Sequence, residues 1–238
     1  MSLPDAPVSA GWEVVTLPGK SPTRYSIDLQ EGSAAWRAEA HRSASMIKYR
    51  LGIAPERLSS VEFSWWVDRL IPGANLAEAG EGDAPARMML AFEGDRTRFS
   101  ARNRMISDMA EAMGAEPLPY ATLMYVWSNQ HPPETVLIHP RTDRIRKIVL
   151  EQGDVGLRQW RRYQRNVVRD FELAFGEPPG ALAAVALMTD ADNLSSSAVS
   201  WYGPIRFGQD PWLPLPPVGT RAASVLSLAV KAPEKLTP

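Results

Sequence analysis

Two carboxylates and one amide stand close together in the last quarter of the sequence. Asp190, Asp192 and Asn193 occur in the stretch ALMTDADNLSSSAVSWYGPIRF, between two segments that have the composition of β-strands. Three chemistries suit such a group: it can supply oxygen ligands to a hard cation, do acid/base work on a substrate, or cap a turn through its side chains. The residue types alone leave these three alternatives open.

Calcium is the candidate ion for this stretch, because Asp190, Asp192 and Asn193 offer only oxygen donors. The segment DADNLSSSAVSW is not an EF-hand loop, since it lacks glycine at position six and has Trp201 at position twelve, where glutamate is required. A calcium site with Asp190, Asp192 and Asn193 as metal ligands therefore needs further oxygens, from carbonyl groups or from a distant carboxylate such as Asp170 or Asp83.

A second pair of charged residues, Asp83 and Arg87, lies in GEGDAPARMML, where a long polar loop meets a predicted strand. Arg87 enters a run that is apolar on both faces, so its guanidinium must find a partner. Asp83 and Arg87 could form a clamp for a ligand. The alternative is a structural ion pair of Arg87 with Asp83, Asp170 or Glu62.

Tryptophan is abundant, with 8 residues in 238. An exposed indole ring is a good platform for a sugar ring, although tryptophan is more often a packing residue. Trp65 and Trp66 are neighbours and point to opposite faces of a strand, and Trp127 and Trp201 lie near strand ends. The predicted ligand-binding residues are Trp66, Asp83, Arg87, Trp127, Asp170 and Trp201.

Five arginines recur at helical spacing in RQWRRYQRNVVRDF, namely Arg158, Arg161, Arg162, Arg165 and Arg169. They suit either a solvated helix face or a surface for an anionic partner. The net charge of −1 argues against a protein that binds DNA through its whole surface.

Several kinds of chemistry lose support. The chain has no cysteine, and its 3 histidines show no metal-ligand spacing. We find no H-E-x-x-H, G-x-S-x-G, P-loop or G-x-G-x-x-G motif. Paired carboxylates are the one catalytic arrangement left open.

The longest apolar run, ALAAVALM, is too short for membrane insertion. No signal peptide is visible, so we expect the cytoplasm by default, or the periplasm if a signal has been removed.

The elements that must position these residues are mainly strands. Short β-branched and aromatic segments follow one another, separated by Gly, Pro or Ser, among them GWEVVTL, RYSIDLQ and LSSVEFSWWV. In SMIKYRL the residues alternate, with Met46, Lys48 and Arg50 on one face, as in a half-buried strand. Two helices interrupt this pattern. One is predicted within residues 96–116, with Phe99, Met105 or Ile106, Met109 and Met113 on one face. The other spans residues 158–175, with Trp160, Tyr163, Val167, Phe171 and Phe175 on one stripe.

This order of elements predicts a mainly β fold, an antiparallel β-sandwich or jelly roll with two inserted helices. We expect one domain over residues 11–208 and a Pro-rich C-terminal tail over residues 209–238, in which AASVLSLAV adds a strand or docks on a neighbour.

The ordered set FSWWV, DAPARMMLAF, YVWS, FGEPP, MTDADN and WYGPIRF resembles a bacterial family known as domain of unknown function 3047, from about Gly11 to Phe207. The pattern is also similar to galactose-binding-like jelly rolls, the fold of many carbohydrate-binding modules. By fold analogy this favours a non-catalytic binding module for a carbohydrate or similar polar small molecule. Two alternatives remain: an enzyme that acts on a glycan or related polymer through paired carboxylates, and a scaffold that binds a protein partner.

Overall fold

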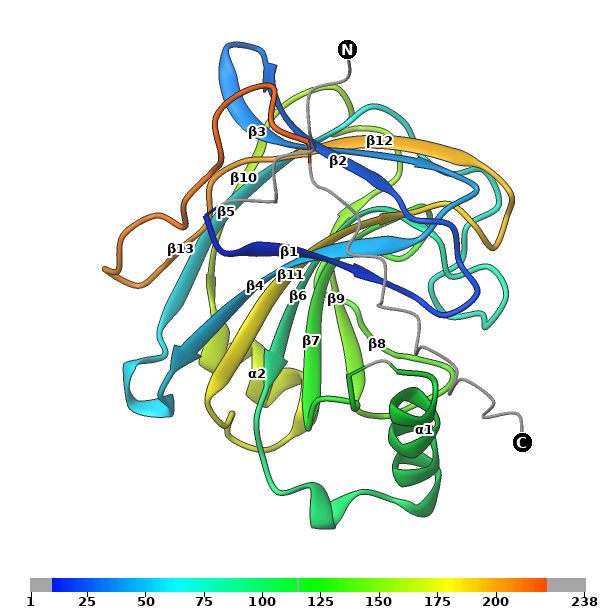
Figure 1. The fold of residues 1–238 in the computed structure, drawn as a ribbon, viewed down its shortest axis with the longest axis vertical. Coiled ribbons are helices and arrows are strands. Elements are labelled where there is room, and N and C mark those ends of the chain that lie inside the picture. Colours follow the sequence, from blue (N-terminus) through cyan, green and yellow to red (C-terminus); the bar gives the residue numbers. More distant parts are fainter. Residues whose placement is uncertain (1–9, 115, 222–238) are drawn as a thin grey trace, which may run out of the picture.

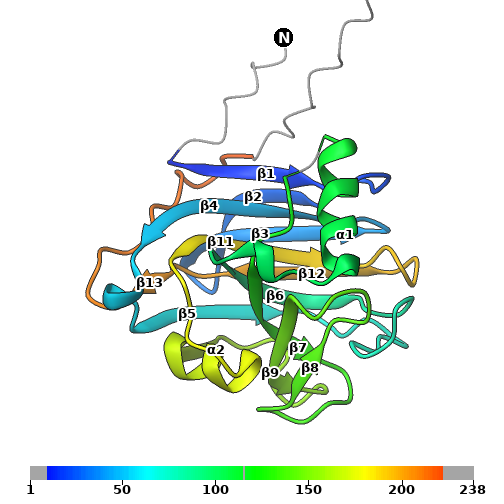
Figure 2. The ribbon, with the colours of Figure 1, turned by 90° about the horizontal axis from the view of Figure 1, so that it is seen from below.

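The computed structural model describes residues 10–114 and 116–221. It is built from two β-sheets that lie face to face, with two α-helices at their margins (Figures 1 and 2). The mainly β fold class predicted from the sequence is confirmed. The segment AASVLSLAV lies outside the described residues.

One sheet has seven strands, in the order β1-β4-β11-β6-β7-β9-β8. Its strands are β1 (Trp12–Thr16), β4 (Ser45–Ile53), β11 (Leu182–Asp190), β6 (Ala84–Phe92), β7 (Ala121–Ser128), β9 (Ile145–Gln152) and β8 (Val136–Ile138). All neighbours are antiparallel except β7 and β9, which run parallel because β8 returns along the outer edge of β9.

The other sheet has six strands. Five of them follow the order β10-β5-β12-β3-β2, and β13 pairs with β5 beyond the end of β12. These strands are β10 (Arg161–Asn166), β5 (Ser60–Val67), β12 (Ser197–Tyr202), β3 (Ser33–His41), β2 (Arg24–Gln30) and β13 (Arg206–Phe207).

The core fills the space between the sheets. Alternate residues along each strand point inward, so aromatic rings from distant segments meet there. Trp36, Trp65 and Trp127 are completely buried, and the Trp65 and Trp127 rings lie 6.4 Å apart. The Trp127 indole N–H donates to the Gly153 carbonyl at 2.8 Å. Trp127 is therefore a core residue without a free ring face, rather than the stacking platform that the sequence suggested.

The second predicted helix is shorter than its periodicity indicated. Residues 161–166 form strand β10, which pairs with β5 along its whole length, and α2 covers only Val167–Phe175. Asn166 marks the change, because its side chain accepts a hydrogen bond from the backbone N–H of Arg169 at 3.0 Å. The helix ends at Gly176, which has φ of 70°.

Strand geometry also redistributes the arginines. Arg161 and Arg165 share one face of β10 and bind Glu151 and Asp170, whereas Arg162 points to the opposite face. The five arginines therefore do not form one helical stripe.

The first predicted helix is α1 (Ala101–Ala112), and its orientation is the reverse of the expected one. Its buried residues are Asn103 and Ser107, while Met105, Met109 and Met113 are more than half exposed. The buried side is held by polar bonds: the Asn103 amide donates to Asp143 at 2.6 Å and accepts from the Thr142 hydroxyl at 2.8 Å. Polar docking thus outweighs the apolar periodicity of this segment.

The segment after β13 follows the six-stranded sheet. The Leu213 N–H donates to the Ile205 carbonyl at 2.7 Å, and Thr220 and Gly219 bond with Ile27 of β2. The described part of the predicted tail, residues 209–221, thus lies against the sandwich. None of the helices in the described ranges combines the length and the apolar character needed to cross a membrane.

Candidate functional site

The antiparallel pairing of β6 with β11 brings the predicted acidic residues together. Asp190, at the end of β11, lies opposite Ala84, so Asp83 stands near it, immediately before β6. Asp192 follows in the next turn. Carboxylate oxygens of Asp83, Asp190 and Asp192 lie within 4.8 Å of one another, and we call these three residues the acidic cluster.

Each carboxylate of the acidic cluster already has donors from the protein. The Asp190 carboxylate accepts two hydrogen bonds from the Arg87 guanidinium, at 2.8 and 2.9 Å, and one from the Ala84 N–H at 3.1 Å. Asp83 accepts the backbone N–H groups of Asn193 and Leu194, at 3.2 and 2.9 Å. Asp192 is paired with Lys20. The turn at 191–194 is therefore capped by a carboxylate 110 residues away in the chain.

Arg87 thus takes a partner that differs from the three candidates considered from the sequence. Both side chains of the Arg87–Asp190 pair are only 7% exposed, and Arg87 also donates to the Gly82 carbonyl. Burial raises the pKa of Asp190 to about 6, against the opposing effect of Arg87, and the nearby Asp83 adds to the rise. The pair is a buried structural ion pair that ties β6 to β11.

Two further ionisable groups lie near this pair. Burial and the neighbouring Arg87 lower the pKa of Lys147 to about 7, and its ammonium donates to the Leu76 carbonyl at 2.6 Å. Burial, Lys147 and Arg87 lower the pKa of His139 to about 4. Both shifts favour the neutral forms of Lys147 and His139, so the positive charge that meets Asp190 comes from Arg87.

The oxygen ligands of the acidic cluster suit calcium in kind, but several of their acceptor positions already bind donors from the protein. A cation bound there must displace Lys20 from Asp192 or share the oxygens that bind Arg87 and the turn amides. Asn193, the third predicted ligand, is exposed and contributes its backbone N–H to Asp83. The calcium site stays a prediction from the sequence.

Asp170 does not join the acidic cluster. It lies in α2, where its carboxylate accepts hydrogen bonds from Arg165, at 2.8 and 2.9 Å, and from the Tyr125 hydroxyl at 2.7 Å. Burial and this carboxylate raise the pKa of Tyr125 well above its usual value. Asp170 therefore anchors α2 and β10 to the core, in a place separate from the other predicted ligand-binding carboxylates.

Trp66 and Trp201 lie on the outer face of the six-stranded sheet. They are opposite each other across β5 and β12, with ring centroids 5.0 Å apart at 87°. The Trp66 indole donates to Glu31 at 3.1 Å, and the Arg37 guanidinium lies 5.7 Å from the Trp201 ring centre. Trp66 is 8% exposed and Trp201 is half-buried, so this pair forms a packed aromatic floor.

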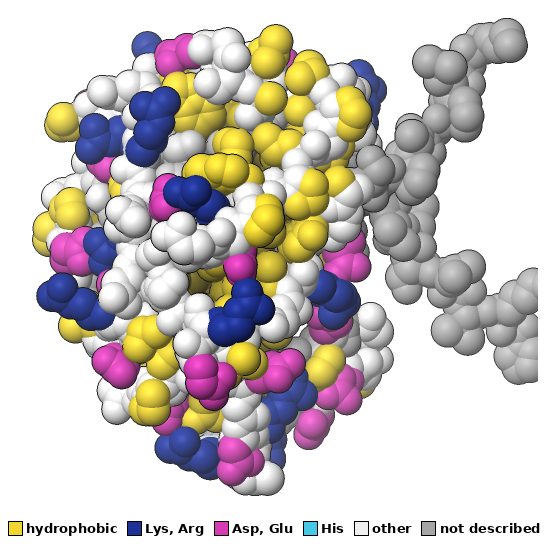
Figure 3. Space-filling model, turned by 90° about the vertical axis from the view of Figure 1, so that its left-hand side faces the viewer, with side chains coloured by type: hydrophobic (Ala, Val, Ile, Leu, Met, Phe, Trp, Pro, Cys, Tyr) yellow, Lys and Arg dark blue, Asp and Glu magenta, His cyan; other side chains and the backbone are white. Residues whose placement is uncertain are grey.

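A groove continues from this floor along the same sheet face. Its volume is about 630 Å³, and we call it the aromatic groove. Strands β5 and β10, the residue before β10 and the segment after β12 build it, with Ser33 at the start of β3. Its lining consists of Ser33, Glu62, Phe63, Ser64, Trp160, Arg162, Tyr163, Gly203, Pro204 and residues 212–215. Figure 3 shows this side of the molecule, where hydrophobic side chains gather around acidic and basic ones.

Trp212 and Trp160 are the two indoles of the groove. Trp212 is 48% exposed and rests on Arg206, whose guanidinium carbon lies 4.6 Å from the ring centre. Arg206 is itself bound to Glu62 at 2.6 Å. Trp160 is half-buried, with its indole N–H near the Gln30 carbonyl at 3.3 Å.

Gly203 keeps the floor of the groove open. A Cβ at this position would overlap the Ser64 hydroxyl and stand 3.6 Å from the Trp160 ring. The Gly203 N–H donates to the Ser64 carbonyl at 2.9 Å, so the two backbones are close. Only a residue without a side chain fits this approach unless Ser64 moves.

Reasoning from the sequence missed this part of the site. It placed Trp160 on a helix stripe, left Glu62 as an ion-pair partner and put Trp212 in an extended tail. One local signal was present: WYGPIRF and DPWLPLP place Gly203 and Trp212 within one short stretch that is rich in proline.

Comparison with known proteins gives a family for most of the chain. Residues 10–206 match the model of a family described as "Protein of unknown function (DUF3047)". The chain belongs to this family. The resemblance noted in the sequence is thereby confirmed, and DUF3047 spans both the acidic cluster and most of the aromatic groove. A search of curated proteins found no match.

Among solved structures, the chain is similar to endoglucanase 3 of Trichoderma harzianum, from family GH12, with 8% identity and a TM-score of 0.42, covering 86% of this chain and 93% of that one. It is also similar to a cellulase derived from Cel12A of Rhodothermus marinus, with 11% identity and a TM-score of 0.44, covering 84% and 92%. It is similar as well to an adhesin domain of Lys-gingipain from Porphyromonas gingivalis, with 9% identity and a TM-score of 0.36, covering 87% of this chain and 95% of that one. At these TM-scores the similarity carries no information about what this DUF3047 protein binds.

Proposed function

We propose that this protein is a non-catalytic module that binds a carbohydrate in the aromatic groove. The observation that carries the proposal is the pairing of Trp160 and Trp212 with polar groups in one hollow of about 630 Å³. A sugar ring has an apolar C–H face, which an indole ring can cover, and a rim of hydroxyls, which need hydrogen-bond partners. The hydroxyl groups of Ser33 and Ser64 and the charged groups of Glu62 and Arg162 supply such partners.

The charges of the groove favour a sugar that carries a carboxylate. Arg162 is exposed and forms no ion pair with any residue in the described ranges. Among the described residues, Glu62 is the one carboxylate of the lining, and Arg206 neutralises it. The free positive charge therefore belongs to Arg162, which can pair with an acidic group of a ligand.

The number of carboxylates in the groove also argues for binding rather than hydrolysis. Glycoside cleavage by paired carboxylates needs two acidic groups about 5–10 Å apart on either side of the scissile bond. Within residues 10–114 and 116–221 the lining provides Glu62 alone, and the acidic cluster lies on the other sheet with oxygens bonded to protein groups. This distribution supports a binding module over the enzyme alternative.

The experiment that tests the proposal is a thermal-shift and calorimetry screen of neutral and acidic oligosaccharides. A ligand at about 100 times its Kd adds roughly 2.7 kcal/mol to the free energy of unfolding, which raises the Tm of a domain of this size by roughly 5–10 °C. The variant Trp212→Ala should reduce the shift in Tm strongly, because it removes an indole ring that we expect to cover the sugar. Since Trp212 is 48% exposed, its loss should leave the fold intact.

Leu173→Ala is the matched control, because Leu173 is 58% exposed on α2, outside the groove. This variant should bind like the unmodified protein. If no member of the screen binds, or if Trp212→Ala and Leu173→Ala bind equally well, the aromatic groove is not a carbohydrate site.

A further inference from the structure

Helix α1 presents an apolar stripe to solvent. Met105, Met109 and Met113 are 56%, 55% and 58% exposed, although they are among the most apolar residues of the helix. Their spacing of four residues places them on one side, opposite the buried Asn103 and Ser107. Two large exposed apolar side chains on one short helix, with a third at its C-cap, Met113, are characteristic of a surface that meets a partner.

The outward side of α1 is an open surface with small residues at both ends. It consists of Ala101, Arg104, Met105, Asp108, Met109 and Ala112, all from this one helix. Alanine at each end lets another backbone come close, while the methionines in the middle supply adaptable contact area. This shape suits a second helix that lies along α1.

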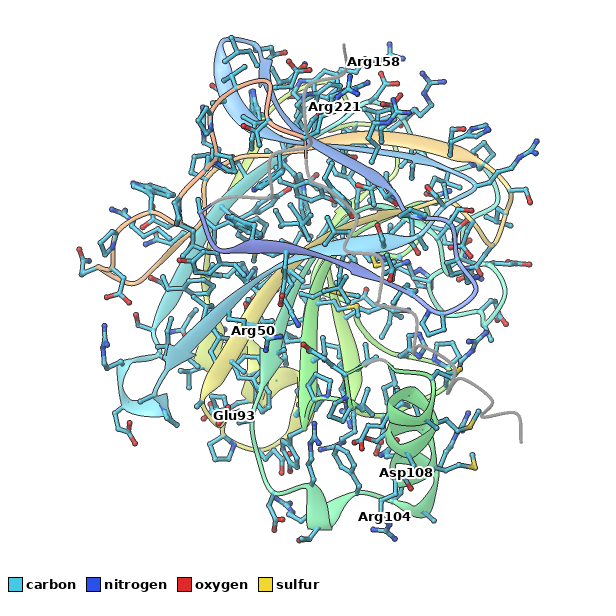
Figure 4. The ribbon with its side chains drawn as sticks, viewed as in Figure 1. Arg50, Glu93, Arg104, Asp108, Arg158 and Arg221 are labelled. Carbon is cyan, nitrogen blue, oxygen red and sulfur yellow. The ribbon has the colours of Figure 1, made fainter. Side chains whose placement is uncertain are left out.

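The charges of α1 are arranged against its dipole. Arg102 and Arg104 occupy the first turn, and Asp108 and Glu111 occupy the second half, with no acidic residue in the first turn and no basic residue in the last. A helix prefers the opposite order, because its N-terminus carries a partial positive charge and its C-terminus a partial negative one. None of these four residues forms an ion pair within the described part of the chain, although Arg104 donates to the Phe99 carbonyl. Figure 4 shows Arg104 and Asp108 together at the surface of the helix.

We propose that α1 pairs with α1 of a second copy of this chain, antiparallel and about a twofold axis. Reversal of direction brings the basic half of one helix against the acidic half of the other. Arg104 of each copy then lies beside Glu111 of the other copy, so the twofold axis creates two such ion pairs. The same reversal places Met105 beside Met109 of the second copy. One arrangement thereby accounts for the exposed methionines, the terminal alanines and the unfavourable order of charges.

The position of the helix permits this contact. α1 lies at the rim of the sandwich, outside both sheets, so a second molecule can reach it without touching the strands (Figure 2). A standard stable interface buries about 800 Å² per partner. One helix of 12 residues offers less than this, so the dimer is weak and forms reversibly with rising concentration.

Sedimentation equilibrium over a wide range of protein concentration tests the proposal. The unmodified chain should pass from monomer to dimer as its concentration rises. Arg104→Glu and Glu111→Arg, made singly, should each raise the dissociation constant at least about fivefold, because each places like charges together. The double variant should return to within about twofold of the unmodified chain, since it restores both pairs with opposite sign.

Arg158→Glu is the matched control, because Arg158 is an exposed arginine at the opposite end of the molecule (Figure 4). It should leave dimerisation unchanged. Thermal melts of all variants confirm that the fold is intact. A chain that stays monomeric at every concentration, a double variant that fails to recover, or an equal effect of Arg158→Glu would each overturn the proposal.

Discussion

The acidic cluster and the aromatic groove lie on different sheets and differ in how their polar groups are used. In the acidic cluster every carboxylate has a partner in the protein. Asp83 accepts hydrogen bonds from backbone N–H groups, Asp192 forms an ion pair with Lys20, and Asp190 is buried in an ion pair with Arg87. In the aromatic groove, Arg162 is exposed, Trp212 is half exposed, and the floor at Gly203 is open.

The difference shows that a concentration of charged residues in the sequence is a weak guide to a ligand site. Buried charged groups need ion-pair or hydrogen-bond partners inside the protein. Charged residues that stand out in a sequence can therefore be occupied by structural contacts. Groups that remain available for a ligand lie where strands and loops leave a hollow, and their chemistry looks ordinary in the sequence.

The largest effect should come from breaking the buried ion pair. Arg87→Met leaves the Asp190 carboxylate buried without its guanidinium, and we expect the free energy of unfolding to fall by about 3–5 kcal/mol. Urea denaturation measures this loss. Asp192→Asn is the comparison, because Lys20 is 40% exposed and the loss of such a pair should cost about 1 kcal/mol or less. Equal losses would show that the Arg87–Asp190 pair is not a special anchor of the two strands.

The next effect concerns Lys147, whose folded-state pKa is lowered to about 7 from 10.5. Between these values the unfolded chain binds more protons than the folded one, so stability should rise with pH, by up to about 1.4 kcal/mol per unit. Below pH 7 both states are protonated and the slope vanishes. Lys147→Met should remove the rise, as seen in urea unfolding curves at pH 7, 8 and 9. A variant with the same slope as the unmodified protein would contradict the burial of this ammonium group.

A smaller effect is expected in the aromatic groove from Gly203→Ala. The new methyl group fills the floor beside Trp160, and we expect the affinity for an oligosaccharide to fall about tenfold, or about 1.4 kcal/mol. Combining it with Ser64→Ala removes the overlap with the Ser64 hydroxyl, so the melting temperature should recover while the affinity does not. Recovery of both would mean that Gly203 serves packing alone and that the ligand does not contact the floor. Ser64→Ala by itself is the control, measured by calorimetry.

The smallest effect should be that of calcium. Because the acidic cluster binds Lys20, Arg87 and two turn amides, we expect calcium to raise the melting temperature by less than about 1 °C, well under the shift that a tight ligand produces. Thermal melts with calcium and then with a chelator measure this. A rise of several degrees that the chelator reverses, and that Asp192→Asn abolishes, would restore the calcium site and reduce the contrast between the two regions.

The strands were predictable because their signals are local. In SMIKYRL, Ile47 is fully buried as the alternation indicates, but Lys48 on the predicted polar face is only 7% exposed, where it pairs with Glu13 and Glu116. The helices were harder. Residues 161–166 have the spacing of a helix, but pairing with β5 makes them a strand, and α1 turns its polar residues inward because Thr142 and Asp143 bind Asn103. In both cases long-range contacts outweighed a periodicity that was visible in the sequence.

By itself the sequence determined the mainly β class, the approximate limits of most strands, the presence of two helices and the grouping of Asp190, Asp192 and Asn193 at a strand end. These features depend on periods of two or 3.6 residues and on nearby turn residues, which act over short distances. Only the tertiary structure decided that Arg87 binds Asp190, that Trp127 is buried while Trp212 is exposed, and that Trp160, Gly203 and Trp212 share one groove. Those outcomes depend on strand order and register, which are set by the burial of the whole chain rather than by any single segment.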